Sequence, residues 1–518
     1  MVLRVMSDHE EECGVAAVFM KKRDGNSKKV PKLLDLMLTP IQKRGQAGTG
    51  AAVYKDVKDR YGEPIFTRKK MESVFSFFGG MNPSKSRNIV RGLKSVSGIG
   101  HVRYPTSQGS NKMNIVRASL QPFYNRSGRS SGRFAFGLNG NLANYVELEK
   151  ELVGDGFDLR TGTDTELMMH TFSDVLPKEG LSFFEMMKRA TPKFDGAYSL
   201  VFLLGNGDVG LMRDLLGIKP LVYGETEDYF VAASESVSLD AVGVSDFSVV
   251  PPGHGVLFSE GGIKVQEILT PKSPTHCQFE GVYFENIGSH FEEISIYEIR
   301  SNWGTNLAKT EELESLIREN KEDIMIVPVP ETPLPTAVAF ANYFGTSSVS
   351  AIDKITAQRG FIAGNKSERT SLMDRNYKVV SPEMLKDKYV FLIEDSIVRS
   401  ETIKKVSALV RDCNPKEIHV RVIEPPVLHP CFYGINFPTY GELIANKYDS
   451  SELEVRIAED IGVNSVRFQS IEGLREGFGS YGDKICTACL NGDYPTSFGI
   501  VRAKEAREIY DASKTSNV

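Results

Sequence analysis

The stretch VFLIEDSIVRSET, residues 390–402, runs from four apolar residues through two adjacent acids into a short polar loop. A buried parallel strand with carboxylates at its carboxyl end has this composition, and the helix after it offers backbone N–H groups to a phosphate. Glu401, however, lies where a negative charge would repel that phosphate. The stretch therefore predicts an α/β domain with a modified phosphate-binding loop.

Length and composition restrict the class of protein. A chain of 518 residues is too long for one hydrophobic core, so we expect two or more domains. An apolar content of 41% and a charged content of 25% are ordinary for a soluble protein, and the net charge of −5 argues against nucleic-acid binding. No apolar run approaches the roughly 18 residues that span a bilayer, and MVLRVMSDHEEEC lacks the apolar segment of a secretory signal. Six cysteines do not suggest a secreted disulfide framework, so we expect a cytoplasmic protein without membrane or nucleic-acid partners.

The first half of the chain has the pattern of an α+β domain. Short apolar runs separated by glycine-rich turns predict strands, and amphipathic stretches predict helices near 31–43, 145–153 and 164–175. The strand candidates are GVAAVF, GTGAAVY, SGIGHVRY, RFAFGLNGN, AYSLVFLL, VGLMRD and YFVAAS. We expect two packed β-sheets covered by helices over residues 13–269.

The second half has a different pattern. TPKSPTH, residues 270–276, is polar and contains prolines, as linkers do. The strand-like runs IMIVPVP, YVFLIED and IHVRVIEPP follow, with helical stretches such as 333–343 and 402–412 among them. This alternation predicts a parallel sheet with ligands at the carboxyl ends of its strands, in a domain covering 270–505. Residues 506–518 are expected to form a flexible tail.

Cys13 begins the small-residue strand CGVAAVF, and taken alone it is an ordinary core cysteine. Six further segments change that interpretation: RGQAGTGAA, GHVRYPTSQGS, SLQPF, LNGNLANYVEL, TGTDTEL and RDLLGIKPLVYG, in this order. Together they resemble the class II glutamine amidotransferase domain, in which an N-terminal nucleophile hydrolyses the side-chain amide of glutamine. The fold implied is the N-terminal-nucleophile glutaminase fold.

The resemblance implies roles for particular residues of the first domain. Cys13 would be the nucleophile and its own α-amino group the base, which requires that residues 1–12 be removed as a propeptide. Asn139 and Gly140 would form the oxyanion hole. Arg103, Thr106 and Asp164 would bind glutamine, with Arg103 on the α-carboxylate and Asp164 on the α-ammonium group. Lys43 and Leu138 replace histidines that are usual in the family.

The opening stretch resembles the signature of type I phosphoribosyltransferases, which bind 5-phosphoribosyl 1-pyrophosphate (PRPP). Across most of its length the chain is similar to the glutamine PRPP amidotransferase family, through segments such as RGFIAGNKSER, HVRVIEPPVLHPCFYGINFPT and ICTACLNGDYPT. That family makes 5-phosphoribosylamine, the first intermediate of purine synthesis, and forms dimers or tetramers. The residues implied for PRPP are Glu394, Asp395, Ser396, Arg399 and Thr402, and those implied for Mg²⁺ are Thr332, Glu394 and Asp395.

Departures from the family pattern gather around the phosphate loops. Ser400 replaces a glycine, Glu401 replaces a threonine, and Pro333 stands where a small residue is usual. Proline has no N–H to offer a phosphate, and a carboxylate near the phosphate weakens binding. Two other functions therefore remain open: a glutaminase that feeds ammonia to a different acceptor, and a regulatory paralogue with an impaired PRPP site.

Four cysteines lie in segments that match the family: Cys277, Cys431, Cys486 and Cys489. In family members that have these positions, they ligate a [4Fe–4S] cluster, and the same is implied here. Four thiolates also suit tetrahedral zinc, and a disulfide pair is the third alternative. Cys413 matches no ligand position and is interpreted as an ordinary residue at a helix end.

Overall fold

The computed structural model describes residues 13–22, 27–55, 63–104, 118–125, 132–176, 182–355 and 377–515. The chain divides into two compact units. Unit 1 comprises the chain up to His276 together with Phe432–Asn436 and Pro495–Arg502, and unit 2 comprises the remainder. The linker predicted at 270–276 thus lies at the end of the main segment of unit 1.

Unit 1 is built on two antiparallel sheets. Sheet A has the order β11-β9-β10-β1-β4-β2-β3 and sheet B the order β13-β12-β8-β7-β6-β5. The strands of sheet A are β1 (Cys13–Met20), β2 (Gly48–Tyr54), β3 (Ile65–Lys70), β4 (Ser97–Arg103), β9 (Val222–Glu225), β10 (Tyr229–Ala233) and β11 (Phe247–Val249). The strands of sheet B are β5 (Phe123–Asn125), β6 (Phe134–Leu142), β7 (Gly196–Leu204), β8 (Val209–Arg213), β12 (His254–Ser259) and β13 (Gly262–Glu267).

Strand β1 is buried on both faces, which explains its run of small apolar residues. Side chains alternate across a strand. Val15, Ala17 and Phe19 enter the core between the two sheets. Ala16 and Val18 enter the core on the other face of sheet A. Any side chain of β1 therefore points into one of two packed layers, and Cys13 shares the face of Val15.

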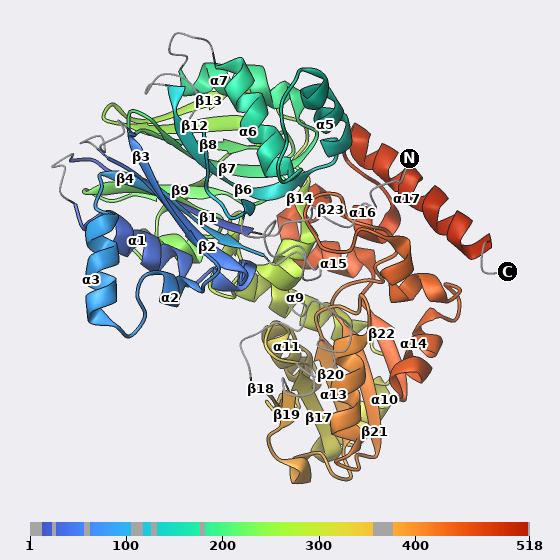
Figure 1. Cartoon of the computed structure of the whole chain (residues 1–518). Coiled ribbons are helices and arrows are strands. Elements are labelled where there is room, and N and C mark those ends of the chain that lie inside the picture. Colours follow the sequence, from blue (N-terminus) through green and yellow to red (C-terminus); the bar gives the residue numbers. More distant parts are fainter. Residues whose placement is uncertain are drawn as a thin grey trace. The chain divides into compact units, whose positions relative to one another are not determined.

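Helices cover the outer faces of both sheets (Figure 1). Beside sheet A lie α1 (Lys29–Leu38), α2 (Val74–Phe77), α3 (Pro83–Gly92) and α8 (Ser236–Asp240). Over sheet B lie α5 (Tyr145–Gly154), α6 (Asp164–Val175) and α7 (Phe183–Ala190). The predicted arrangement of two packed sheets with helices is confirmed.

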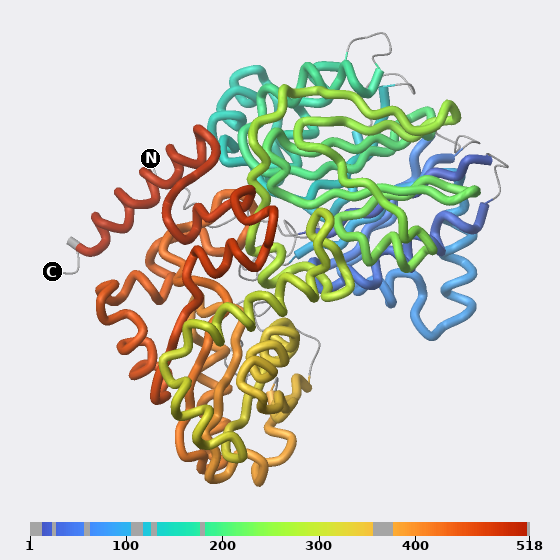
Figure 2. The backbone as a smooth tube through the Cα atoms, turned by 180° about the vertical axis from the view of Figure 1, so that it is seen from behind, coloured from blue at the N-terminus to red at the C-terminus, as the bar shows by residue number. Residues whose placement is uncertain are grey.

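Unit 2 contains a parallel sheet in the order β17-β20-β21-β22, as its alternating pattern predicts. The strands are β17 (Ile324–Pro328), β20 (Tyr389–Glu394), β21 (Glu417–Val422) and β22 (Ser465–Phe468). The helices are α9 (Ile296–Lys309), α10 (Glu314–Glu319), α11 (Leu334–Phe344), α13 (Glu401–Arg411), α14 (Leu453–Ile461), α15 (Ile471–Gly477), α16 (Ala488–Asn491) and the part of α17 (Ser497–Thr515) that follows Arg502. Figure 2 shows α9, in yellow-green, beside the yellow α11.

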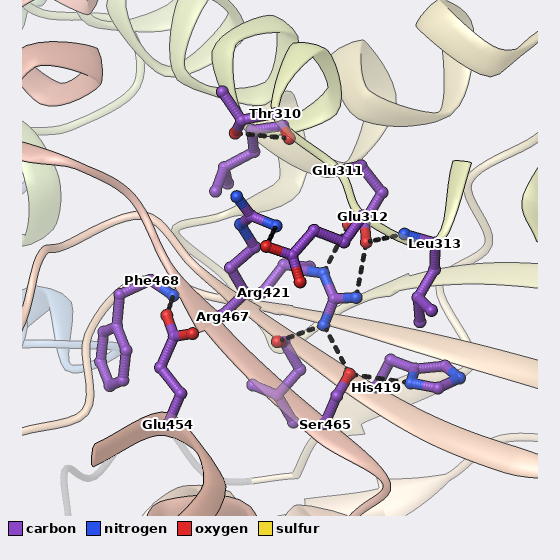
Figure 3. Close-up of polar contacts among 12 residues, drawn as sticks. Thr310, Glu311, Glu312, Leu313, His419, Arg421, Glu454, Ser465, Arg467 and Phe468 are labelled. Carbon is purple, nitrogen blue, oxygen red and sulfur yellow. Dashed lines mark hydrogen bonds and ion pairs between the residues drawn. The ribbon is translucent and has the colours of Figure 1, made fainter. Parts of the chain in front are cut away.

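A buried ion pair lies beside this sheet (Figure 3). Arg421 of β21 donates from Nε and Nη2 to the two carboxylate oxygens of Glu311, at 2.5 and 2.7 Å. The two side chains are 2% and 0% exposed. Nη1 of Arg421 also donates to Ser465 Oγ at 3.0 Å, which joins β21 to β22. Such a pair is costly to break, because either partner left alone is a buried charge.

The predicted flexible tail over 506–518 differs from the structure, in which α17 continues to Thr515. The reason is a contact that the sequence does not reveal. The rings of Tyr510 and Tyr440 stack with their centroids 5.7 Å apart, and Tyr510 donates from its hydroxyl to Asn446 O at 3.2 Å. These contacts fix the helix end where the composition suggested fraying. In the part of the chain that the structure describes, no helix is long and apolar enough to cross a membrane.

Candidate active sites and the cysteine group

Cys13 and Arg103 face the space between the two sheets of unit 1. They are paired directly across β1 and β4, so their side chains leave the sheet on the same face. On that face Cys13 is followed by Val15, and Arg103 is preceded by Ile99, and both apolar side chains belong to the core between the sheets. Cys13 is 0% exposed and Arg103 is 2% exposed. A thiol and a guanidinium are therefore placed side by side in a buried layer.

Asn139 approaches the same layer from β6. Alternation along β6 sends Leu138 into the core under the helices and Ala135 toward sheet A, so Asn139, four residues after Ala135, also faces sheet A. Asn139 is 0% exposed, and neither of its side-chain polar atoms has a hydrogen-bond partner within the described ranges. Buried amides normally have partners, so an unpartnered one indicates a group kept for a ligand.

Gly140 occupies a position that excludes any other residue. Its φ of +143° is disfavoured for L side chains, and a Cβ atom there would lie 2.0 Å from Ala197 O. The backbone conformation of β6 next to Asn139 thus depends on this glycine. Its position fits the predicted oxyanion pair of a side-chain amide and a neighbouring backbone N–H.

A buried ion pair holds the backbone at Cys13. Arg44 Nε donates to Cys13 O at 3.1 Å, and Arg44 Nη1 lies 2.8 Å from Glu235 Oε1. The side chains of Arg44 and Glu235 are 1% and 0% exposed. One residue before Glu235, Ser234 accepts a hydrogen bond from Val15 N at 3.0 Å. No role was predicted for these residues, although Arg44 begins the RGQAGTGAA segment.

Asp164 begins helix α6, where the helix dipole stabilises a negative charge. It is 1% exposed, and its carboxylate accepts hydrogen bonds from Thr165 N at 2.7 Å and from Leu142 N at 3.3 Å. Arg103 donates from Nη1 to Ser119 O at 2.6 Å. Both predicted glutamine-binding residues are thus fixed by backbone contacts, while Thr106 lies outside the described residues.

Both polar groups of the Leu138 backbone, next to Asn139, are hydrogen-bonded to side chains. Gln121 Oε1 accepts a hydrogen bond from Leu138 N at 2.7 Å, and His101 Nε2 donates to Leu138 O at 3.1 Å. Burial lowers the pKa of His101 to about 3, so the ring is neutral near pH 7, and Nε2 carries its proton because a carbonyl only accepts. Both residues lie in quoted segments, yet no sequence signal marks them as supports of β6.

The acid pair of unit 2 ends the buried strand β20. Glu394 is 5% exposed, its Oε1 accepts a hydrogen bond from Asp395 N at 3.1 Å, and its Oε2 has no partner within the described ranges. Burial, and then the charge of Asp395, raises the pKa of Glu394 well above its ordinary value. Asp395 Oδ1 accepts a hydrogen bond from Ser396 Oγ at 2.9 Å. A cation or hydroxyl group at this edge would stabilise the ionised pair.

The loop after the acid pair ends at Ser400, in a left-handed conformation with φ of +65°. Glycine adopts this conformation without strain, and serine does not. Glu401 then starts α13, and neither Glu401 nor Thr402 is fully buried. The guanidinium of Arg399 pairs with Glu442, with Nε 2.9 Å from Oε2. Arg399 thus anchors the loop to another part of unit 2.

The loop after β17 lies at the same edge of the sheet, because β17 and β20 are neighbouring parallel strands. Glu331 is exposed, Thr332 is half-buried and Pro333 is buried at the N-cap of α11. Pro333 therefore removes one N–H from a helix start that otherwise suits an anion. The two loops that depart from the family pattern thus flank one edge.

The four family-matching cysteines are all buried in unit 2, with exposures of 7 to 8%. Burial raises the pKa of the Cys489 thiol well above its ordinary value, and Glu424, Cys431, Cys486 and Cys277 add to the effect in that order. Cys277 and Cys486 lie on the paired strands β14 (His276–Cys277) and β23 (Ile485–Cys486), and the backbone N atoms of Leu428 and His429, just before Cys431, both donate to Cys489 O at 3.0 Å. None of the six cysteines, all within the described ranges, forms a disulfide.

Among the described residues, no group of three or more His, Cys, Asp or Glu side chains is arranged to hold a metal ion, so the structure by itself favours neither the cluster nor zinc. Cys413 lies just beyond α13, where its thiol donates to Leu409 O at 3.3 Å.

Comparison with known proteins bears on both units. Residues 111–241 match the family model described as glutamine amidotransferase domain. The chain is 33% identical over 494 residues to the amidophosphoribosyltransferase of Methanothermobacter thermautotrophicus, covering 95% of this chain and 96% of that protein. It is 28% identical over 492 residues to the amidophosphoribosyltransferase of Bacillus subtilis, covering 94% of each. The solved glutamine PRPP amidotransferase of B. subtilis, complexed with ADP and GMP, aligns with a TM-score of 0.78 at 27% identity, covering 94% of this chain and 98% of that one.

Proposed function

The chain belongs to the amidophosphoribosyltransferase family, and we propose that it hydrolyses glutamine at Cys13 and transfers the ammonia to C1 of PRPP. The products are glutamate, 5-phosphoribosylamine and pyrophosphate. The observation that carries the proposal is the meeting of Cys13, Arg103 and the unpartnered amide of Asn139 in one buried layer. A nucleophile, a carboxylate-binding cation and an oxyanion donor are the groups that amide hydrolysis requires.

In the first half-reaction, Cys13 Sγ attacks the side-chain carbonyl carbon of glutamine. The thiol proton passes to the α-amino group of Cys13, which exists only if residues 1–12 are removed, and then to the departing ammonia. Asn139 and Gly140 stabilise the oxyanion, and water then hydrolyses the thioester to glutamate. Arg103, Thr106 and Asp164 hold the amino-acid end of the substrate.

In the second half-reaction, ammonia attacks C1 of the ribose and pyrophosphate leaves with the bonding electrons. The family depends on Mg²⁺, which would neutralise charge on the pyrophosphate. Thr332, Glu394 and Asp395 would hold the ion, and the two carboxylates would also bind the ribose hydroxyls. Ser396, Arg399 and Thr402 complete the 5-phosphate loop, where the contact with Glu442 gives Arg399 a role in holding the loop.

We further propose that Cys277, Cys431, Cys486 and Cys489 hold a [4Fe–4S] cluster. The donor set supports this proposal, because the four thiols are buried in unit 2 and their segments are joined by the pairing of β14 with β23 and by the hydrogen bonds to Cys489 O. The cluster would tie distant segments of unit 2 together. Anaerobically purified protein should carry about four iron atoms per chain, and zinc at one atom per chain would reject the cluster.

The experiment that tests the function is pyrophosphate release by purified, iron-loaded protein, with either glutamine or ammonia as the nitrogen donor. Wild-type protein should release pyrophosphate with both donors. Cys13→Ala should lose the glutamine-dependent reaction and keep the ammonia-dependent one. If the wild type forms glutamate but releases no pyrophosphate from PRPP, the acceptor is a different compound; if it does neither, the regulatory alternative holds.

Intact mass tests the proposed base and the proposed domain limits. The mature chain should begin at Cys13, and an active enzyme that retains residues 1–12 would contradict the role of the α-amino group. We assign residues 13–269 to glutamine hydrolysis and 270–505 to the phosphoribosyl reaction. The enzyme is proposed to be a cytoplasmic dimer or tetramer, which sedimentation and fractionation test directly.

A further inference from the structure

Gln278 is a buried amide that contacts two functional groups of unit 2. It directly follows Cys277 and is 1% exposed. Its Nε2 lies 2.6 Å from Glu424 Oε1 and 3.5 Å from Cys489 Sγ. An amide nitrogen has two hydrogens, so Gln278 donates to the carboxylate and to the sulfur at once. One side chain thus contacts the cysteine group and an acid outside it.

Glu424 carries the connection on to the acid pair. It lies just beyond β21, beside the end of β20, and is 0% exposed. Its backbone N donates to Asp395 O at 2.9 Å, and the preceding Ile423 N donates to Glu394 O at 3.0 Å. The residue that accepts from Gln278 is therefore hydrogen-bonded through its backbone to the strand end that carries Glu394 and Asp395.

We propose that Gln278 is a positioning residue that couples the cysteine site to the phosphoribosyl site, through its shared hydrogen bonds to Cys489 and Glu424. The inference rests on the proposed cluster and deepens it. Hydrogen bonds to ligand sulfurs tune a cluster's stability and reduction potential. A group bound at the acid pair and a cluster bound by the cysteines then change each other's affinity by the same factor, as linkage requires.

The variant Gln278→Met removes both hydrogen bonds with little change in volume. Its matched control is Gln469→Met, because Gln469 is also buried, in the same unit, and its Nε2 donates only to Trp303 O, at 3.3 Å, among the contacts described. The first readout is the rate at which an iron chelator bleaches the anaerobic holoprotein, with and without Mg·PRPP. The second is the midpoint potential of the cluster under the same two conditions.

In the wild type and in Gln469→Met, Mg·PRPP should change both the rate of bleaching and the midpoint potential. In Gln278→Met the cluster should be lost about tenfold faster, as is typical when a partner of a metal ligand is removed, and its potential should be lower. The effect of Mg·PRPP on both quantities should vanish. A purely structural role would lower stability in both variants alike and would leave the dependence on Mg·PRPP intact.

If Gln278→Met does not fold, Glu424→Met tests the same contact from the other side, because it removes the carboxyl group to which Gln278 Nε2 donates. A wild type that holds iron while Gln278→Met keeps the full response to Mg·PRPP would overturn the coupling and leave the proposed function standing. A wild type without iron would refute the cluster and this inference together, while pyrophosphate release would still report on the reaction itself.

Discussion

Replacing Asn139 by leucine should separate catalysis from stability. The side chain is fully buried, and its two polar atoms have no hydrogen-bond partner in the described part of the chain. In the resting protein the amide is therefore a destabilising group, and its benefit arises only when an oxyanion forms beside it. Leucine has a similar branched shape and no polar atoms.

The substitution should lower kcat and raise the free energy of unfolding. Loss of one oxyanion donor lowers kcat by about 10²–10³, equivalent to about 2.7–4 kcal/mol of the barrier. A polar atom buried without a partner costs about 1–3 kcal/mol, so removing both atoms stabilises unit 1 by about 2–6 kcal/mol. Overpacking by the larger leucine offsets about 1–3 kcal/mol of that gain. The two ranges combine to between about −1 and 5 kcal/mol, and we expect a net stabilisation near their middle, of about 2 kcal/mol.

Asn141, two residues along the same strand, is the matched control. Its Nδ2 donates to Phe432 O at 3.2 Å, whereas its Oδ1 has no partner within the described ranges. Asn141→Leu therefore removes one unpartnered atom and creates another, so stability should hardly change, and activity should fall far less than in Asn139→Leu. Glutamate release and calorimetric unfolding of the whole protein measure the two quantities. A kcat within tenfold of wild type, or a loss of stability in Asn139→Leu, would refute the assignment.

Substitutions elsewhere test the phosphate loop, a buried ion pair and a buried histidine. Ser400→Gly combined with Glu401→Thr should tighten PRPP by at least about tenfold, or about 1.4 kcal/mol, by calorimetric titration; unchanged affinity would mean that Glu401 points away from the phosphate. Arg421→Met should destabilise unit 2 by about 3–5 kcal/mol in urea unfolding, because it leaves Glu311 charged and buried (Figure 3). Adding Glu311→Leu to Arg421→Met should restore most of the lost free energy of unfolding. If the single and the double variant lose the same amount, the buried charge of Glu311 is not the cause. The pKa of His101 falls from 6.5 to about 3 on folding, so its contribution to the free energy of unfolding is complete above pH 6.5 and declines by up to about 1.4 kcal/mol per pH unit below it. In thermal unfolding, His101→Gln should lose less stability than the wild type as the pH falls. Parallel pH dependences of the two proteins would contradict this prediction.

The fold was predictable where the residue pattern of a segment is unambiguous. Doubly buried strands such as β1 and β20 are nearly continuous apolar runs, which marks them as strands, whereas the order of the strands in each sheet was not predicted. The first helix shows where the prediction failed. A helix was expected over 31–43, but α1 ends at Leu38 because Pro40 has no N–H with which to continue the hydrogen bonds of the helix. The chain after Pro40 is thereby free to bring Arg44 to Cys13 O.

The candidate sites were predictable as motifs but not as contacts. Cys13, Arg103 and Asn139 lie in recognisable segments, so their roles were expected before their common layer was known. Arg399 was expected at the phosphate, and its ion pair with Glu442, 43 residues further on, has no local sequence signal. Contacts of this kind depend on the packing of distant segments, which periodicity does not encode.

The phosphate loop contains one strained residue, Ser400, and two stabilising ones, Arg399 and Glu401. Their contributions together affect the free energy of PRPP binding. A serine in the left-handed conformation costs about 1–2 kcal/mol. Arg399 offsets that strain through Glu442, and Glu401 adds about 0.3–1 kcal/mol in the first turn of α13, where the helix dipole favours a negative charge. The loop is thus held in shape before any phosphate arrives, and we expect an incoming phosphate to displace the Glu401 carboxylate from the helix N-terminus. We therefore expect a PRPP affinity set by this competition, so that at PRPP concentrations below saturation the rate of the second half-reaction rises in proportion to the supply of PRPP.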